Sequence, residues 1–267
     1  GNAAVYGGIL KSLRKKGVPP VSATDGPSGI RLHCYASLLP IGTLLASTWN
    51  QQLVRELYAA EGAEMARKGS DVLLAPGMNI HRDPLCGRNF EYYSEDPVVV
   101  GVTGTAATLG VQKSKGVGVT IKHYALNSQE TSRNKENNTV SERAIREIYL
   151  KGFEMVVKQA QPMAIMTSYN QNNGRPAADD YDLCTAFARD EWGFKGMIMT
   201  DWTTTEIDEK CTASGCMRAG NDLVMPGCFG DHDNMRKALA EGTLKIEDLK
   251  ACIARLVSVI WKSNQYF

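Results

Sequence analysis

The sequence predicts an α/β fold built around a parallel sheet, and three observations lead to this prediction. Six short apolar runs alternate with segments of helical periodicity, which is the pattern of parallel α/β folds. Several of these runs end in polar, titratable side chains, as strands do where such folds build their functional sites. The chain has 267 residues, and a (β/α)8 barrel typically needs about 250.

The predicted strands are apolar runs without a helical period. The run 197–199 shows this best, because it is wholly apolar and is followed by Asp201 and Trp202. Taken alone, Asp201 could equally cap the next helix, since Asp is a favoured N-cap residue. Polar groups at other strand ends favour a site instead. The six candidate strands are 18–24, 71–76, 117–121, 163–170, 197–199 and 222–227.

The predicted helices carry apolar positions three and four residues apart. In the first long one, Leu53 and Leu57 fall near one face and Gly69 ends the helix. Ser141 can cap another, which Pro162 closes. The long candidates are 50–68, 98–112, 141–157, 180–192 and 248–262. A shorter amphipathic helix is predicted within residues 1–18, with an apolar face of Ile9, Leu10 and Leu13.

Composition excludes several classes of function. The net charge of +1 gives no reason to expect nucleic acid or a charged membrane surface as a partner. We find no transmembrane run and no signal peptide. The seven cysteines form no CxxC pair or zinc spacing, which favours reduced thiols in a cytoplasmic protein and leaves a secreted one open. A start at Gly1 rather than Met suggests a processed piece of something longer.

The polar groups at the strand ends suit a sugar. If they meet at one mouth of the fold, carboxylates accept from hydroxyls, Lys and Arg donate to them, and Trp covers the apolar face of the ring. A carboxylate below the anomeric carbon can attack it, and neighbouring cations would keep that carboxylate ionised. The residues that we expect to meet there are Asp25, Arg88, Lys122, His123, Tyr169, Asp201 and Trp202.

Some polar residues and motifs of this chain also fit other interpretations. The Asp25-Gly-Pro turn is a weak motif that also occurs in ordinary surface turns. His81 and Asp83, in the long loop 77–97, could be metal ligands, but the nearby arginines would oppose a cation. We find no Gly-rich phosphate loop, no defensible Ser-His-Asp pattern and no metal cluster. The sequence therefore predicts no cofactor and no metal.

The motifs taken together resemble the barrel domain of glycoside hydrolase family 3, of the β-glucosidase type. The matching stretches cover most of the chain in the family's order and are Asp25–Arg31, Gly87–Pro97, Lys122–His123, Met166–Tyr169 with Asn173–Gly174, Thr200–Trp202 and Asn221–Gly227. The resemblance implies a (β/α)8 TIM-type barrel, here with an irregular or missing first strand or helix. It also implies a retaining, exo-acting enzyme that removes a terminal non-reducing β-D-glucosyl residue.

The resemblance also implies a role for each site residue. Asp201 would be the nucleophile that forms the glycosyl-enzyme, Tyr169 would support it, and Trp202 would line the subsite, with Met166 as a wall residue. Four residues would bind the sugar hydroxyls, namely Asp25, Arg88, Lys122 and His123. Asp25 in its turn favours a glucose-type sugar over xylose, because the C6 hydroxyl needs a partner.

One departure from the family pattern affects the domain organisation. The general acid/base of such glucosidases is usually a Glu on a separate sandwich domain, and nothing in this chain matches that domain. We therefore expect residues 1–267 to be a single barrel domain, with the acid/base on another domain or chain as its partner. The substrate would be a β-glucoside or oligosaccharide, and a homo-oligomer stays open.

Three other functions are alternatives to that of a β-glucosidase. A β-N-acetylhexosaminidase of this family carries a Lys-His-Phe-Pro-Gly-His-Gly type run, whereas here Lys122-His123 is followed by Tyr124-Ala125. A non-catalytic sugar-binding barrel would have no need of Asp201. A β-xylosidase or α-L-arabinofuranosidase remains an alternative for the whole protein.

Overall fold

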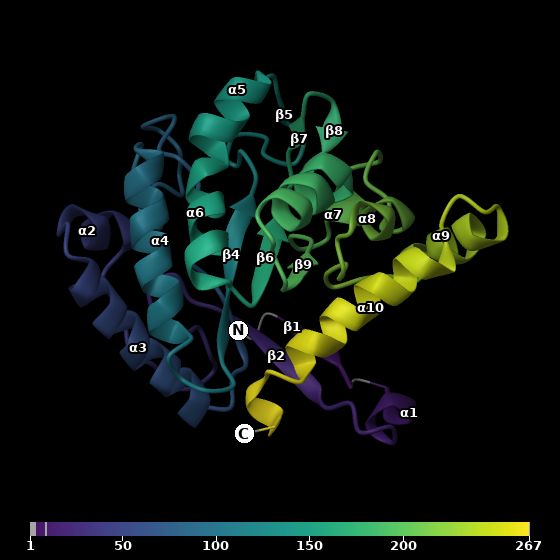
Figure 1. Ribbon diagram of the computed structural model, residues 1–267, viewed down its shortest axis with the longest axis horizontal. Helices are drawn as coiled ribbons and strands as arrows, with labels where there is room; N and C mark the ends of the chain where they lie inside the picture. Colours follow the sequence, from purple (N-terminus) through teal and green to yellow (C-terminus); the bar gives the residue numbers. More distant parts are fainter. Residues whose placement is uncertain (1–3, 9, 267) are drawn as a thin grey trace.

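The computed structural model describes residues 4–8 and 10–266, so Ile9 of the predicted N-terminal helix lies outside the described residues. A six-stranded sheet forms the centre of the molecule (Figure 1), in the order β1-β2-β3-β4-β6-β9. Its strands are β1 (Ala4–Gly7), β2 (Pro20–Asp25), β3 (Val72–Leu74), β4 (Gly118–Tyr124), β6 (Ala164–Thr167) and β9 (Met197–Met199).

The sheet is parallel from β2 onward. Ala23 pairs with Val72, Thr120 with Ala164, and Ala164 in turn with Met197. β1 alone runs antiparallel to its neighbour β2. The fold is a TIM-like (β/α) barrel with the irregular first strand that was expected, and its sheet is curled and open, with six strands rather than eight in the described part of the chain.

The strands are buried on both faces, which explains their unbroken apolar runs. Successive side chains point to opposite faces of the sheet. On β3, Leu73 belongs to the large core beneath the helices, whereas Val72 and Leu74 belong to the core inside the curl. Each face therefore has its own apolar layer.

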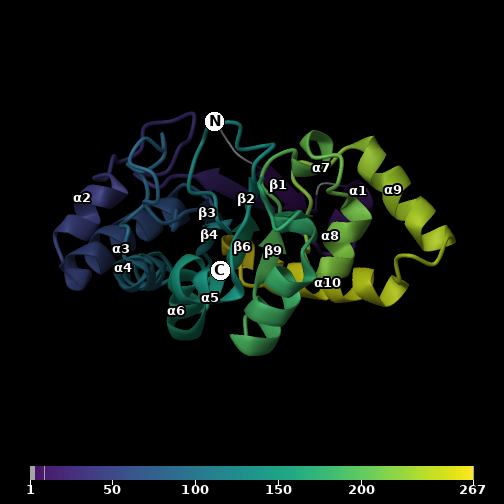
Figure 2. The same cartoon turned by 90° about the horizontal axis from the view of Figure 1, so that it is seen from above.

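Three helices cover the outer face of the sheet and pack side by side, namely α3, α4 and α6 (Figure 2). Asn50 caps α3 by accepting from the Leu53 amide at 3.0 Å, and Asp96 caps α4. The helices are α1 (Lys11–Arg14), α2 (Gly42–Ser47), α3 (Gln51–Arg67), α4 (Pro97–Val111), α5 (Glu142–Ala144), α6 (Lys151–Ala160), α7 (Thr204–Ile207), α8 (Ala213–Ala219), α9 (Phe229–Ala240) and α10 (Ile246–Ile260).

The helices predicted at 141–157 and 180–192 contain wider turns. Ser141 caps the first as expected, by accepting from the Ala144 amide at 3.2 Å. The π-helical segments are η1 (Ile145–Tyr149) and η3 (Asp182–Glu191), and the short 3-10 turns are η2 (Ala177–Asp179) and η4 (Asn264–Tyr266). A second, three-stranded sheet lies in the loops and consists of β5 (Asn137–Asn138), β7 (Gln171–Asn172) and β8 (Arg175–Pro176).

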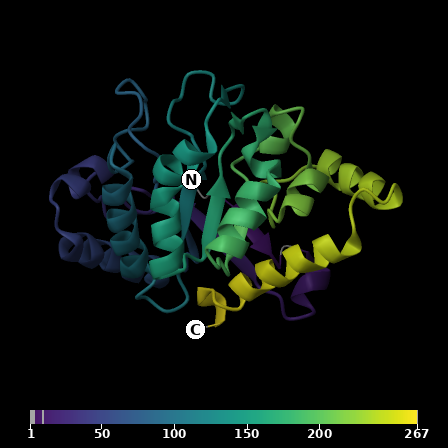
Figure 3. The same ribbon diagram turned by 45° about the horizontal axis from the view of Figure 1, so that its top comes forward.

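The final helix, α10, spans the two edges of the curled sheet, because it packs against both β1 and β9. Ile260 of α10 lies so close to Gly7 of β1 that a Cβ there would stand 2.9 Å from it. Figure 3 shows the C-terminal end of α10 at one end of the barrel and the loops after β3 and β4 at the other. Those loops leave from the carboxyl ends of the strands.

Two predictions about strands need correction. The segment 222–227 is not a strand, and Leu223 makes only an isolated parallel bridge with Met199. The carboxylate of Asp222 accepts a hydrogen bond from the Ile198 amide at 2.8 Å. A side chain thus replaces part of the backbone hydrogen bonding that a strand would make with β9. Strand β4 also continues past Ile121, so that Lys122 and His123 lie within it rather than after it.

Candidate active site

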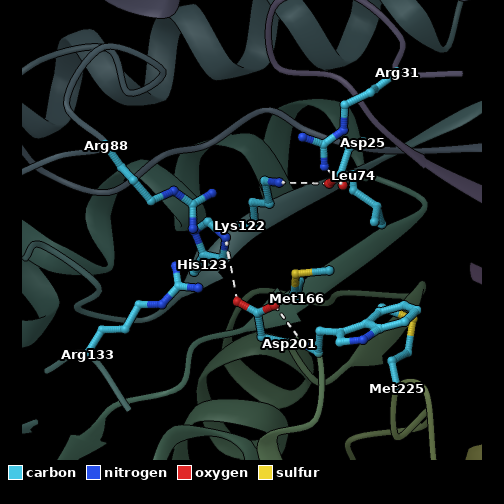
Figure 4. A pocket seen from close by; sticks show the side chains of 11 residues that line it. Asp25, Arg31, Leu74, Arg88, Lys122, His123, Arg133, Met166, Asp201 and Met225 are labelled. Carbon is cyan, nitrogen blue, oxygen red and sulfur yellow. Dashed lines mark hydrogen bonds and ion pairs between the residues drawn. The ribbon is translucent and has the colours of Figure 1, made fainter. Parts of the chain in front are cut away.

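A cavity of about 460 Å³ opens at the carboxyl ends of the strands (Figure 4). Because neighbouring parallel strands end at the same edge of the sheet, residues far apart in sequence meet there. The cavity is lined by Asp25, Arg31, Leu74, Arg88, Lys122, His123, Arg133, Met166, Asp201, Trp202 and Met225.

Each strand delivers its own part of the site. Asp25 is the last residue of β2, and Met166 lies in β6. Lys122 and His123 come from β4, and Asp201 follows β9. Two longer side chains, Arg88 and Arg133, reach in from the loops after β3 and β4.

Asp201 lies largely buried in the cavity wall. Its Oδ1 accepts a hydrogen bond from the Trp202 amide at 2.7 Å, and its Oδ2 lies 3.7 Å from Nε2 of His123. Tyr169 is hydrogen-bonded to the same carboxyl group. Burial raises the pKa of Asp201, while the Trp202 amide and the positive charges around the cavity, among them Lys122, oppose that rise.

Asp25 is held between two cations. Arg31 forms an ion pair with one carboxylate oxygen, and Nζ of Lys122 lies 3.6 Å from the other. The turn itself is tight, because the Arg31 amide donates to the Asp25 carbonyl at 2.8 Å. At Gly29, with φ +108°, a Cβ would stand 2.1 Å from the Ser37 carbonyl oxygen, so only glycine fits.

Lys122 and His123 both have buried, titratable side chains. Burial lowers the pKa of the Lys122 ammonium below its ordinary value. Burial, together with the positive charges of Arg88 and Lys122 among others, holds the pKa of His123 well below its usual range, so its ring is neutral. Asn79 fixes the backbone of His123, accepting from its amide and donating to its carbonyl, both at 2.8 Å.

The two loop arginines are each paired with a glutamate outside the cavity lining. Arg88 forms an ion pair with Glu91. Arg133 donates to Glu130 at 2.9 Å and stacks over the ring of Tyr169 at 4.8 Å. Both guanidinium groups keep further donors for a ligand in the cavity, since each has five N–H groups.

The structure brings together the residues that the sequence singled out. Seven of the eight line the cavity, and Tyr169, outside that lining, is hydrogen-bonded to Asp201. Sequence reasoning missed Arg31, Leu74, Arg133 and Met225 as cavity residues. Arg133 stands in an Asn-rich polar loop without a recognisable pattern, and only its place shortly after Lys122-His123 could have pointed to it.

The described residues contain no group of three or more His, Cys, Asp or Glu side chains that could hold a metal ion. Cationic hydrogen-bond donors and carboxylate acceptors instead face the open space of the cavity, which suits a polar organic ligand with many hydroxyl groups. Among the described helices, none is both long and apolar enough to cross a lipid bilayer.

Comparison with known proteins identifies the relatives of the chain. The model of the family "Glycosyl hydrolase family 3 N terminal domain" matches residues 7–259. A β-glucosidase from Ruminococcus albus is 43% identical across 99% of this chain, and an exo-α-(1→6)-L-arabinopyranosidase from Bifidobacterium longum is 38% identical across 96%. The aligned parts make up 29% and 34% of those two proteins.

A solved structure shares the fold over nearly the whole chain. The β-glucosidase 3B from Thermotoga neapolitana in complex with glucose superposes with a TM-score of 0.90 at 41% identity, and covers 94% of this chain. The match takes up 37% of that protein. The chain thus spans about a third of the length of the relatives that it matches.

Proposed function

Because this chain belongs to glycosyl hydrolase family 3, we propose that it is the nucleophile-bearing barrel of a retaining, exo-acting β-glucosidase. The observation that carries the proposal is the position of Asp201, a largely buried carboxylate without a close cationic partner in a cavity of donors. The relatives with matching barrels include β-glucosidases, one of them solved with glucose.

In the proposed first step, a carboxylate oxygen of Asp201 attacks the anomeric carbon and the bond to the aglycone oxygen breaks. The sugar is then held as an ester on Asp201, and water releases it in a second step with net retention. Tyr169 and the Trp202 amide hold the carboxylate in place through their hydrogen bonds. The Trp202 amide is bound to Oδ1, and Oδ2 lies 3.7 Å from Nε2 of His123.

The sugar would be bound by the groups opposite Asp201. Asp25 accepts from hydroxyl groups, while Lys122, Arg88 and Arg133 donate to them. Trp202 supplies an aromatic face and Met166 an apolar wall. Since Asp25 stands at the far side of the cavity from Asp201 (Figure 4), it is suited to the hydroxyls remote from the anomeric carbon, including that on C6.

We further propose that the general acid/base comes from another domain or chain. The carboxyl groups that line the described cavity are those of Asp25 and Asp201. Asp25 is held in ion pairs with Arg31 and Lys122 and is assigned to the sugar hydroxyls. Glu91 is buried and paired with Arg88. General acid assistance is worth about 10²–10⁴-fold, so the barrel alone would be a weak catalyst.

The substrate is proposed to be a β-glucoside or oligosaccharide. The Bifidobacterium longum relative acts on another pyranoside, as its name says, so a different sugar is the main alternative. A xylosidase or arabinofuranosidase would not need Asp25 for a C6 hydroxyl. We also propose a cytoplasmic protein, which is supported by seven cysteines that are all free.

The proposal is tested by turnover of a nitrophenyl β-glucoside. The expected result is activity in the full-length natural protein, lost on Asp201→Asn, and much weaker activity in residues 1–267 alone. Full activity from residues 1–267 would show that the acid/base lies within them. An active Asp201→Asn protein would overturn the assignment of the nucleophile.

A further inference from the structure

His123 is the one cavity residue whose chemistry depends on which of its two nitrogens carries the proton. Both nitrogens have defined neighbours: Nδ1 lies 3.2 Å from the hydroxyl of Tyr92, and Nε2 lies 3.7 Å from the carboxylate of Asp201. The ring is buried, and Asn79 holds its backbone on both sides. A neutral ring carries one proton, so one nitrogen donates and the other accepts.

The direction of the hydrogen bonds can be followed from Glu130 inward. The Glu130 carboxylate can only accept, so the side-chain nitrogen of Asn127, 3.3 Å away, must face it. The same nitrogen donates to the Tyr92 hydroxyl at 3.1 Å. The Tyr92 oxygen is then an acceptor from Asn127, and its own hydrogen is free to be donated to Nδ1 of His123.

The opposite tautomer, with the proton on Nδ1, is unfavourable at both ring nitrogens. With the proton on Nδ1, the hydroxyl hydrogen of Tyr92 would lose its acceptor in a buried site, at a cost in free energy. The lone pair of Nε2 would also face the negative charge of Asp201. With the proton on Nε2, both conflicts disappear, and the N–H bond points into the cavity.

We propose that Tyr92 and Asn127 are positioning residues that fix His123 in its Nε2–H form, so that it donates to the sugar beside Asp201. The separation of 3.7 Å exceeds a hydrogen bond, so this donor is not consumed by the carboxylate. The donation to a sugar rests on the function proposed above, whereas the tautomer follows from the protein's own contacts. Neither residue lines the cavity.

Nitrogen NMR of ring-¹⁵N-labelled histidine in the full-length natural protein tests the tautomer without any turnover. The signal of His123, one of four histidines in this chain, is identified by its loss in His123→Gln. We expect the Nε2–H pattern in the wild type and a partial shift toward Nδ1–H in Tyr92→Phe, where only Asp201 still favours Nε2–H. In Asn127→Asp at pH 8, the new carboxylate accepts a hydrogen bond from the Tyr92 hydroxyl. The Tyr92 oxygen can then only accept from the ring, so the pattern should change to Nδ1–H. A wild-type Nδ1–H pattern, or the same pattern in all three proteins, would overturn the proposal.

Tyr93→Phe is the matched control. Its hydroxyl is also buried but lies 3.3 Å from that of Tyr58, away from His123. It should leave the histidine signals unchanged, whereas a change as large as that in Tyr92→Phe would show a general packing effect. If Tyr92→Phe fails to fold, as seen in its thermal melt, the Asn127→Asp spectrum decides alone.

Kinetics then separate positioning from packing. Tyr92→Phe should lower kcat/KM about tenfold, the value of one hydrogen bond. It should have no further effect in a His123→Ala background, because Tyr92 acts through His123. Losses that multiply in the double variant would contradict the proposal. Correct tautomers without glucosidase activity would instead reject the proposed function and leave the positioning role intact.

Discussion

Two aspartates beside the last strand of the sheet show how the same side chain is used in opposite ways. Asp222 is wholly buried and receives two arginines, Arg189 and Arg255, each at 2.7 Å, and the Ile198 amide at 2.8 Å. Asp201 accepts one backbone amide, that of Trp202 at 2.7 Å, and its other carboxylate oxygen lies 3.7 Å from Nε2 of His123. Burial raises the pKa of both carboxyl groups, and different neighbours oppose it.

The difference indicates what each group is for. A carboxylate whose oxygens all accept hydrogen bonds can connect secondary-structure elements. Asp222 connects β9 to η3 and α10 in this way. A carboxylate that keeps an oxygen free can react. The molecule therefore carries a satisfied charge for structure and an underpartnered one for chemistry within the same part of the fold.

The largest effect is expected from Asp201→Asn. The amide cannot attack the anomeric carbon, so kcat on a nitrophenyl β-glucoside should fall by at least about 10³-fold. The free energy of unfolding should change by less than about 1 kcal/mol, because Asn still accepts the Trp202 amide and carries no buried charge. Denaturant titration and initial rates on the same samples check both halves. A large loss of stability would place Asp201 with Asp222 as a structural group.

Asp222→Asn should show the reverse pattern. Removing the charge leaves two arginines without their partner, which costs about 3–5 kcal/mol for a buried pair. The control is Asp182→Asn, whose partner Arg175 is exposed on the surface and whose loss should cost less than about 1 kcal/mol. Equal shifts in the denaturant midpoints of the two variants would refute the contrast.

Glu61 is a third buried carboxyl, placed behind the Asp25 turn. Burial and the nearby Glu64 raise its pKa from 4.5 to about 8. Its protonated form therefore contributes stability that is complete below about pH 4.5 and is lost as the pH rises through 8. Glu61→Gln should remove that loss and stabilise the protein at pH 8–9 by up to a few kcal/mol. The surface variant Glu147→Gln should leave the profile of melting temperature against pH unchanged, and a wild-type slope in Glu61→Gln would contradict the assignment.

The smallest effect concerns the choice of sugar. Asp25→Ala should lower kcat/KM for glucosides more than for xylosides, by about 10–100-fold in the ratio of the two values. Only a glucoside has the C6 hydroxyl whose hydrogen bond to Asp25 is lost. Paired assays with nitrophenyl glucoside and xyloside measure it. Equal losses on both substrates would remove the argument for a glucose-type sugar.

Much of the fold and site could be predicted because the decisive signals are local. Apolar runs flanked by turns predicted β2, β3, β4, β6 and β9, and their polar ends marked Asp201, Lys122 and His123. Strand β1 gave no such signal, because it is four residues long and pairs at the edge beside Gly7-Gly8. The polar helix α9 also escaped notice, because it packs mainly on α8 and buries little.

The remaining site residues depend on contacts that are distant in sequence. Arg133 reaches the cavity because its loop carries β5, which pairs with β7 more than thirty residues away. The segment 222–227 was predicted as a strand because it is apolar. In the structure, the carboxylate of Asp222 accepts the Ile198 amide in place of a backbone carbonyl, and Pro226 has no amide proton to donate. Neither relation is visible in a local pattern.

The most direct test of Asp201 as the nucleophile is to trap the full-length natural protein with a slow 2-deoxy-2-fluoro-β-glucoside and map the labelled peptide by mass spectrometry. We predict one sugar adduct on the peptide that contains Asp201, and no adduct in Asp201→Asn. An adduct on any other carboxylate, or its survival in Asp201→Asn, would contradict the assignment.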